Sequence, residues 1–259
     1  MRERPARFEP DAAIADPAQR RGRGAVSNRS GRFEATQRSQ VHDGWEIEEA
    51  LAPLKTEVAV DRSRSIISKV PSPDMPFNRS INPYRGCEHG CVYCFARPTH
   101  AYLGHSPGLD FETKLVMKPE AARLLRRALE RKSYAPEPIA IGTNTDPYQP
   151  LEKKMKIMRG VLETLAEFNH PVTIVTKSAL VARDADILGE MGRRGLARVA
   201  LSLTTLDAGL SRTMEPRAAA PQRRLWAMRT LAAAGCPVGV MAAPMIPAIN
   251  DHELEALLR

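Results

Sequence analysis

Short apolar runs alternate with longer amphipathic stretches along most of this chain, and this alternation restricts the fold strongly. The apolar runs are Ser80–Tyr84, Pro138–Gly142, Val172–Thr176, Val199–Leu203 and Val238–Ala243. The other stretches predict helices near Pro119–Lys132, Glu152–Phe168, Arg183–Arg194 and Pro221–Ala234, with one more that begins near Asp251. This pattern is typical of βα units around a parallel sheet. The sequence therefore predicts an α/β fold with five βα units.

Polar or chemically special residues follow each expected strand. Cysteines follow the first, and the later strands are followed by Thr143–Asp146, Lys177–Ser178, Thr204–Thr205 and Pro244. Functional residues of a parallel βα array gather at the carboxyl ends of its strands. We therefore expect a functional site at this edge. A doubly wound open sheet stays an alternative, although no Gly-x-Gly-x-x-Gly motif follows any expected strand.

Three cysteines after the first strand, Cys87, Cys91 and Cys94, form a C-x3-C-x2-C motif. Three thiolates this close can hold three irons of a [4Fe–4S] cluster. The fourth cysteine of the chain, Cys236, is far along the sequence and is expected to be a small buried residue. Electron-transfer clusters commonly have four cysteine ligands, so a three-cysteine cluster would leave one iron open to a small molecule.

Other interpretations of the motif stay open. A Cys3His zinc site could be completed by His89, His100 or His105, although structural zinc sites usually present two C-x2-C or Cys/His pairs and only one is found here. A disulfide framework is less favoured, because four cysteines in 259 residues are few and three of them are too close for most pairings.

The N-terminal part differs in composition from the remainder. Residues 1–42 contain nine arginines and five acidic residues with few apolar ones, so we expect residues 1–55 to be a basic, mostly disordered extension of a core domain at residues 56–259. Within that core, Thr56–Val60 and Ser65–Val70 are expected as extended pieces that cover one end of the main sheet. The formal net charge of +8 permits contact with nucleic acid without requiring it.

Membrane and secretion signals are not expected. No run of 18 apolar residues is present, and the N-terminus lacks the apolar segment of a secretory signal. With unpaired cysteines, this predicts a protein of the reducing cytoplasm that does not contact membranes.

Two motifs flank the expected strand ends: Asn82-Pro-Tyr-Arg-Gly-Cys87 and Gly142-Thr-Asn-Thr-Asp-Pro-Tyr-Gln-Pro150. With the cysteine motif, they resemble the radical S-adenosylmethionine (SAM) superfamily, and within it an uncharacterised bacterial branch of spore photoproduct lyase-like (DNA repair photolyase-like) proteins. The resemblance covers about residues 75–255. It implies a partial (β/α)6 TIM-like barrel. Since five units precede the last residue, Arg259, we expect the sixth unit to be missing and the core domain to be incomplete at its C-terminal end.

The resemblance also implies a site. Cys87, Cys91 and Cys94 would ligate a [4Fe–4S] cluster, and SAM would chelate its open iron. An ammonium at Lys177 can pair with the methionine carboxylate, and hydroxyl groups can hydrogen-bond to SAM. The residues that the resemblance places around SAM are Tyr93, Thr145, Lys177 and Ser202. Asn144 and Asp146 are further candidates, for which a role in forming the turn stays the alternative.

The implied activity is that of a lyase-like radical SAM enzyme. A donor such as flavodoxin or ferredoxin would reduce the cluster, and SAM would be cleaved to methionine and a 5′-deoxyadenosyl radical that abstracts hydrogen from a substrate, with nucleic acid as the class suggested by the family. Thr143 and Phe95 stand where the lyase has its hydrogen-donating cysteine and relay tyrosine, so its hydrogen-transfer relay is not expected here. The alternative is a non-enzymatic nucleic-acid-binding protein stabilised by an iron–sulfur cluster or zinc. A catalytic residue and an oligomeric state cannot be assigned from the sequence.

Overall fold

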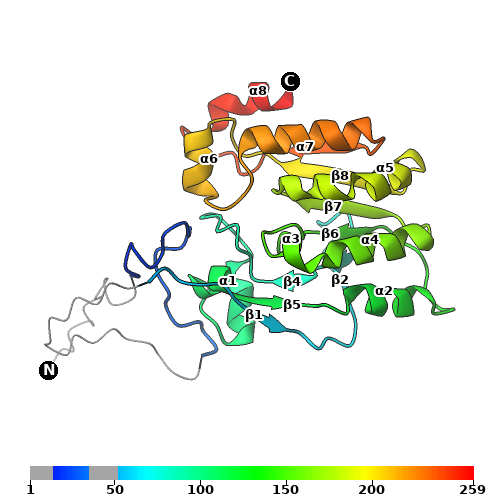
Figure 1. Cartoon of the computed structure of the whole chain (residues 1–259), viewed down its shortest axis with the longest axis horizontal. Helices are drawn as coiled ribbons and strands as arrows, with labels where there is room; N and C mark the ends of the chain where they lie inside the picture. The colour runs from blue at the N-terminus through cyan, green and yellow to red at the C-terminus, as the bar shows by residue number, and fades with distance from the viewer. Residues whose placement is uncertain (1–13, 35–51) are drawn as a thin grey trace, which may run out of the picture.

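Two mixed β-sheets organise the chain in the computed structural model, which describes residues 14–34 and 52–259 (Figure 1). The larger sheet has the strand order β2-β3-β6-β7-β8-β9, and the smaller one has the order β1-β5-β4. The strands of the larger sheet are β2 (Ile67–Lys69), β3 (Arg79–Ile81), β6 (Ile139–Ile141), β7 (Val172–Thr176), β8 (Ala197–Ser202) and β9 (Val238–Met241). Those of the smaller sheet are β1 (Glu57–Val60), β4 (Tyr84–Arg85) and β5 (Lys114–Met117).

Five parallel neighbours are confirmed where five strands are predicted, but the first is shorter than predicted: β3 ends at Ile81, and Tyr84 belongs to β4 of the smaller sheet. β3, β6, β7, β8 and β9 pair in chain order, and only β2 joins this sheet antiparallel. Every residue of β6 is buried, because β6 lies in the middle of the sheet and is covered on both faces. The carboxyl ends of the five parallel strands therefore meet at one edge.

Helices α2, α4, α5 and α7 stack in chain order along the larger sheet (Figure 1). The stack is close: a Cβ atom on Gly160 of α4 would lie 3.3 Å from the Cβ of Ala122 on α2. No described helix is long and apolar enough to cross a bilayer. The α-helices are α1 (Asp110–Thr113), α2 (Ala121–Leu129), α3 (Glu152–Met155), α4 (Ile157–Glu167), α5 (Ala185–Arg193), α6 (Ala208–Met214), α7 (Pro221–Ala233) and α8 (Leu254–Leu258), and the 3-10 helices are η1 (Arg97–Leu103), η2 (Ala179–Asp184) and η3 (Asp251–Glu253).

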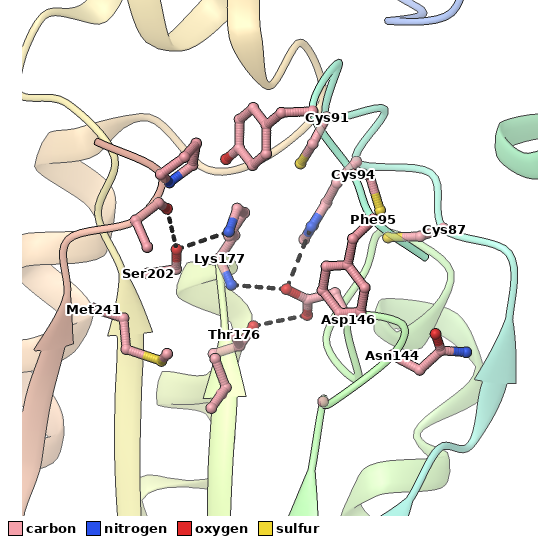
Figure 2. A pocket seen from close by; sticks show the side chains of 16 residues that line it. Cys87, Cys91, Cys94, Phe95, Asn144, Asp146, Thr176, Lys177, Ser202 and Met241 are labelled. Carbon is pink, nitrogen blue, oxygen red and sulfur yellow. Dashed lines mark hydrogen bonds and ion pairs between the residues drawn. The ribbon is translucent and has the colours of Figure 1, made fainter. Parts of the chain in front are cut away.

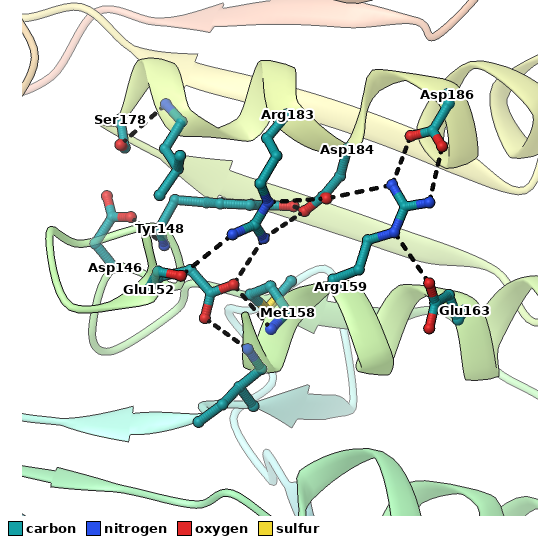
Figure 3. Close-up of polar contacts among 12 residues, drawn as sticks. Asp146, Tyr148, Glu152, Met158, Arg159, Glu163, Ser178, Arg183, Asp184 and Asp186 are labelled. Atoms are coloured by element: carbon teal, nitrogen blue, oxygen red, sulfur yellow. Dashed lines mark hydrogen bonds and ion pairs between the residues drawn. The ribbon is translucent and has the colours of Figure 1, made fainter. Parts of the chain in front are cut away.

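The helix predicted at Glu152–Phe168 is divided into α3 and α4 at Lys156, whose φ is 53°. The buried Glu152 carboxylate accepts hydrogen bonds from the first backbone N–H groups of α4, those of Ile157 (3.0 Å) and Met158 (3.1 Å). It also accepts from Arg183, at 2.7 Å, and from the Tyr84 hydroxyl. Figure 3 shows the bonds of Glu152 to Arg183 and to the start of α4. Glu152 thus caps α4 and ties it to β4 and η2.

Residues 14–34 of the N-terminal extension pack against the region around α1, while the expected disorder of most of residues 1–55 stays a prediction. The buried Glu112 carboxylate accepts from the backbone N–H groups of Gly24 (3.0 Å) and Ala25 (2.8 Å), and Asn28 bonds to Asp110 at 2.9 Å. A buried carboxylate must be hydrogen-bonded, and this need orders a segment whose composition alone predicts disorder. Residues 1–13 and 35–51 of the extension lie outside the described residues.

The expected extended pieces have separate places. β2 lies at the edge of the larger sheet, as predicted. β1 instead pairs parallel with β5 in the smaller sheet, so its predicted place on the main sheet is wrong. β5 is not predicted from the sequence, because its four residues continue directly from helix α1. Strands this short carry little periodic signal.

Candidate active site

A cavity of about 370 Å³ lies at the carboxyl ends of the parallel strands (Figure 2). All three motif cysteines line it; Cys87 and Cys91 are buried, and Cys94 is half-buried. Five of the other predicted site residues also line the cavity: Tyr93, Asn144, Asp146, Lys177 and Ser202. Thr145 does not line it: its side chain is buried and its hydroxyl donates to the backbone oxygen of Tyr84 at 2.7 Å.

Two glycines with positive φ shape the cysteine loop, which we define as residues 86–94. The φ angles of Gly86 and Gly90 are 73° and 68°. A Cβ atom on Gly86 would lie 2.9 Å from the Phe111 backbone oxygen, and one on Gly90 would lie 2.8 Å from the Glu112 carboxylate. Any other residue at either position would therefore combine backbone strain with a close contact. These glycines let the loop turn tightly enough to bring its cysteines into one cavity.

Side chains from outside the cysteine loop hold its backbone. Gln149 accepts from the Glu88 N–H at 2.9 Å and donates to the Gly86 oxygen at 3.2 Å. Arg97 donates to the Cys91 oxygen from two nitrogens, at 3.0 and 3.3 Å, and pairs with Glu112 at 2.6 Å. The loop is therefore fixed from η1 and the second strand end together, which positions the cysteines in advance of any ligand.

The cysteine donors fit an iron–sulfur cluster. Burial raises the pKa of Cys87, and it raises the pKa of Cys91 to about 12 although the nearby Lys177 charge acts in the opposite direction. Such thiols stay protonated at neutral pH until a cation replaces the protons, so metal binding here would release protons. Thiolates are the ligands preferred by iron–sulfur clusters, and each cysteine would serve a different iron.

The zinc interpretation finds less support in the geometry. Within residues 14–34 and 52–259, no three His, Cys, Asp or Glu side chains converge as the ligands of one ion would. Of the three candidate histidines, only His89 lines the cavity, and its Nδ1 lies 3.4 Å from the Asp146 carboxylate. His100 is buried with its ring against those of Phe111 and His105.

Lys177 and Ser202 meet across two neighbouring strand ends. The Lys177 ammonium donates to the Ser202 hydroxyl at 2.7 Å and lies 5.7 Å from the centre of the Tyr93 ring. Figure 2 shows this lysine pointing into the cavity toward the cysteines. No acidic side chain of the described residues pairs with the Lys177 ammonium within 4.0 Å. The charge is therefore available to an anionic group in the cavity.

Asp146 joins the cysteine loop to the third strand end. Its carboxylate accepts from the Thr176 hydroxyl and the Lys177 N–H, both at 2.7 Å, and faces His89 of the loop. It also accepts from the Tyr148 N–H at 2.8 Å. With these bonds its oxygens are directed at the protein, so Asp146 orients its neighbours. Asn144 also lines the cavity, and its backbone N–H donates to the Asn82 side chain at 3.1 Å.

A buried network behind Tyr93 escaped the sequence analysis. The Tyr93 hydroxyl donates to Glu215, which also accepts from Thr204 at 2.7 Å and forms an ion pair with Arg224. Arg224 in turn donates to the Ser202 backbone oxygen at 2.9 Å. Although burial alone would raise the pKa of Glu215, the charges of Arg224 and Lys177 lower it. The network therefore connects the cysteine loop with the end of β8 through an ionised carboxylate.

Phe95 and Thr143, which replace the expected relay tyrosine and hydrogen-donating cysteine, lie in different places relative to the cavity. Phe95 lines the cavity and is 78% exposed, so its ring lies at the mouth. Thr143 does not line it, and its hydroxyl accepts a weak hydrogen bond, at 3.5 Å, from Asn82. Cys236 is buried just before β9 and is not among the lining residues.

We expect Asp146 to make stability fall at low pH. Burial alone would raise its pKa, but the His89 charge and the bonds from Lys177 and Thr176 lower it to about 2. Because this folded value lies below the ordinary value, the stabilisation is present above about pH 4 and is lost as the pH falls toward 2. The free energy of unfolding should therefore drop by about 2 kcal/mol more for the wild type than for Asp146→Asn between about pH 5 and pH 2.

Urea denaturation at several pH values measures this difference. Asp74→Asn removes an exposed carboxylate and serves as the control. Its free energy of unfolding should differ from that of the wild type by the same amount at every pH. If the Asp146→Asn difference is also constant over this range, the ionised network around Asp146 is not formed.

Comparison with known sequences identifies a family match. The sequence model described as the Radical SAM superfamily matches residues 81–259. An uncharacterised protein of Mycobacterium tuberculosis is 42% identical over 198 residues, which are 75% of this chain and 58% of that protein. An uncharacterised protein of Methanocaldococcus jannaschii is 27% identical over 174 residues, 67% of this chain and 62% of its own. The chain thus spans less than two thirds of the length of these relatives.

Comparison with solved structures shows a shared fold. A complex of spore photoproduct lyase with dinucleoside spore photoproduct has a TM-score of 0.54 and 19% identity, covering 73% of this chain and 51% of the lyase chain. A lyase mutant with bound AdoMet and the same dinucleoside has a TM-score of 0.53 and 19% identity, covering 72% of this chain and 50% of the lyase.

Proposed function

The chain belongs to the radical SAM superfamily, and from this premise we propose that it is an enzyme that uses a [4Fe–4S] cluster and SAM to abstract hydrogen from a substrate. One observation carries the proposal: the three cysteines and the Lys177 ammonium line the same cavity at the strand ends. When bound, the cluster and SAM would supply reductive cleavage of the SAM carbon–sulfur bond and a 5′-deoxyadenosyl radical.

The side chains of the cavity have distinct roles in this proposal. Cys87, Cys91 and Cys94 hold the cluster. Lys177 pairs with the carboxylate of SAM, and Ser202, which now accepts from Lys177, fixes the direction of the ammonium. The Tyr93 ring forms a wall of the cavity beside these groups, where an adenine can pack.

The other predicted residues, Asn144, Thr145 and Asp146, have supporting roles in this proposal. Asn144 offers an amide to the ligand from the second strand end. Asp146 orients Lys177 through its backbone, and Thr145 fixes the chain around Tyr84 instead of contacting the ligand. Of the described lining, Met241 and Pro244 add apolar surface, which limits the access of water to a reactive site.

We infer a lyase-like use of the radical on a substrate of the nucleic-acid class. The likeness to the complex of spore photoproduct lyase with dinucleoside spore photoproduct supports this, as does the net charge of +8. A relay through a tyrosine and a cysteine is not part of the proposal, because Phe95 and Thr143 occupy those positions. The five parallel strands further support a partial (β/α)6 barrel of the superfamily type. Flavodoxin or ferredoxin is the proposed class of reductant.

Anaerobic reconstitution tests the proposal. The reconstituted wild type should contain about four irons per chain and form 5′-deoxyadenosine from SAM when dithionite is added. Lys177→Met should retain the iron and weaken SAM binding by about 10- to 100-fold, since a hydrogen bond to a charged group contributes about 1.5–3 kcal/mol. Equilibrium dialysis with labelled SAM measures this affinity.

Lys153→Met removes an exposed ammonium from α3 and is the matched control, which should bind SAM as the wild type does. Tight binding of zinc without SAM cleavage by the wild type would contradict the proposed function. Equal SAM affinities of Lys177→Met and the wild type would contradict the role of Lys177.

A further inference from the structure

The outer side of the cysteine loop is covered in part by the N-terminal segment. Gly24 lies so close to Gly90 that a Cβ atom on Gly24 would be 1.7 Å from the Gly90 oxygen and 3.4 Å from a methyl carbon of Val92. The hydrogen bonds of Gly24 and Ala25 to Glu112 hold the segment in this place. We call residues 20–24 the basic arm. The arm is thus built against the loop that carries the cysteines.

Val92 marks the point where the loop is open to solvent. Its neighbours Cys91 and Tyr93 line the cavity, whereas Val92 does not and its side chain is 51% exposed. The Val92 N–H donates to the Met214 oxygen at 2.9 Å, so the backbone here is held firmly. An apolar side chain beside a cysteine that lines the cavity is therefore presented on the face of the loop opposite to the cavity.

Two arginines, Arg23 and Arg217, lie close to each other beside the cysteine loop. Arg23 is fixed by bonds to the Glu112 oxygen (2.9 Å), the Leu54 oxygen and the Thr56 hydroxyl (both 3.1 Å). Burial lowers the pKa of Arg23, and so does the charge of Arg217, which places a second guanidinium nearby. Arg217 pairs with Glu88 at 3.2 Å, while Arg21 is exposed and pairs with no described residue.

The arginines of the basic arm lack matching carboxylates. Arg97 pairs with Glu112 and Arg217 with Glu88, and Glu112 is also occupied by the arm backbone. Arg20, Arg21 and Arg23 form no ion pair with a carboxylate of the described residues. A surplus of positive charge around an exposed apolar residue suits a partner with an acidic rim and a small apolar centre.

We propose that the basic arm and Val92 form the docking surface for a small acidic protein that carries one electron. This inference rests on the proposed function. In the docked pair the carrier is oxidised by one electron and the cluster is reduced by one electron, with no bond formed or broken. The carrier reaches the protein on the outer face of the cysteine loop, so the cavity stays free for SAM and substrate.

The position of the arm favours an electron carrier over a nucleic acid at this surface. A substrate must enter the cavity, but the arm covers the opposite side of the loop. A carrier needs only to come close to the cysteines. A carrier that contacts Val92 lies next to Cys91, because these two residues are adjacent in the chain. Interfaces of electron carriers are small and transient, and their association is steered by charge.

Charge reversal at Arg21 tests the proposal. Reduced flavodoxin and reduced ferredoxin serve as probes, and their affinity for the reconstituted protein is measured by calorimetry at low and high salt. The wild type should bind one of them, and raising the salt should weaken that binding. Arg21→Glu should weaken it about tenfold at low salt and lessen its dependence on salt. Arg21→Lys, which keeps the charge, should bind like the wild type.

Arg131→Glu is the matched control, because Arg131 is exposed just beyond α2, on the far side of the molecule from the arm (Figure 1). It should leave carrier binding unchanged. The absorbance of the cluster gives a second readout: reduction by the carrier should slow in Arg21→Glu, while reduction by dithionite, a small ion, should not. Circular dichroism confirms that each variant is folded.

Equal affinity of the wild type and Arg21→Glu, or no binding of either carrier by the wild type, would overturn the docking surface. The same holds if Arg21→Glu loses affinity for a single-stranded oligonucleotide but keeps its affinity for the carrier, which would assign the arm to nucleic acid. Failure of the proposed function is distinguishable, since it would appear as no dithionite-driven SAM cleavage by the wild type.

Discussion

Replacing Cys91 by alanine should remove the iron–sulfur cluster and with it the cleavage of SAM. Cys91 is buried in the cavity wall, and the cavity lining contains only two other thiols among the described residues, those of Cys87 and Cys94. Two thiolates would remain for a cluster that needs three. Loss of an outer-shell partner of a metal ligand commonly costs 10- to 100-fold, so loss of the ligand itself should lower 5′-deoxyadenosine formation by more than about 100-fold.

Cys236→Ala provides the matched control for this substitution. Cys236 is also buried and free, but it lies before β9 and does not line the cavity. The variant should keep its iron content and its SAM cleavage, with a loss of stability of about 1 kcal/mol from the small cavity. Iron analysis, the visible absorbance of the reconstituted protein and product formation are the measurements. A Cys91→Ala protein with full iron content would refute the assignment of the cysteines.

The common edge of the site could be predicted from the sequence because strand ends are a local signal. The run Val172–Thr176 is mostly apolar and lies between Pro171 and Lys177, and β7 has the same bounds. Lys177 follows it directly, so its place at the cavity follows from the parallel order of the strands. The same reasoning correctly places Asn144, Asp146 and Ser202 at the cavity.

Within a loop at a strand end, the direction of each side chain could not be predicted from the sequence. Thr145 lies between two lining residues, Asn144 and Asp146, but points to the Tyr84 oxygen. A turn of four or five residues has no fixed periodicity, so the direction of each side chain is set by its hydrogen bonds. Such bonds join residues distant in sequence and cannot be read from spacing.

The order of residues 14–34 escaped prediction for a related reason. Low apolar content predicts disorder, since little hydrophobic burial is available to offset the loss of chain entropy. In this segment the contacts are polar: Glu112 binds the backbone of Gly24 and Ala25, and Asn28 binds Asp110. Composition measures hydrophobic burial, whereas this docking depends on hydrogen bonds to buried acids.

Replacing Arg224 by methionine should destabilise the protein strongly and loosen the wall of the candidate site. Arg224 is 1% exposed, and it donates to Glu215, to the Ser202 oxygen at 2.9 Å and to the Ala219 oxygen at 2.6 Å. Arg224→Met leaves the Glu215 carboxylate buried without its cation, and removal of one partner from a buried ion pair costs about 3–5 kcal/mol. Urea denaturation measures the free energy of unfolding.

A double-mutant cycle with Glu215→Gln separates the ion pair from packing. If the buried charge is the main cost, Arg224→Met with Glu215→Gln should be more stable than Arg224→Met alone, because a neutral amide is less costly to bury than an unpaired carboxylate. Arg126→Met, which breaks an exposed pair with Glu167, is the matched control and should leave the denaturation midpoint nearly unchanged. Additive effects of the two buried substitutions would contradict a direct Glu215–Arg224 pair.

The consequence for the site follows from the place of Glu215 between Arg224 and Tyr93. In Glu215→Gln the Tyr93 hydroxyl loses an ionised acceptor, so the ring should become more mobile beside Lys177 and the affinity for SAM should fall. Among the described residues, no hydrogen bond joins a motif cysteine side chain to this network, and the iron content should therefore be retained. A Glu215→Gln protein with unchanged SAM affinity but lowered stability would restrict the network to folding, whereas lowered affinity at full iron content would make Glu215 a positioning residue for the wall that Tyr93 forms.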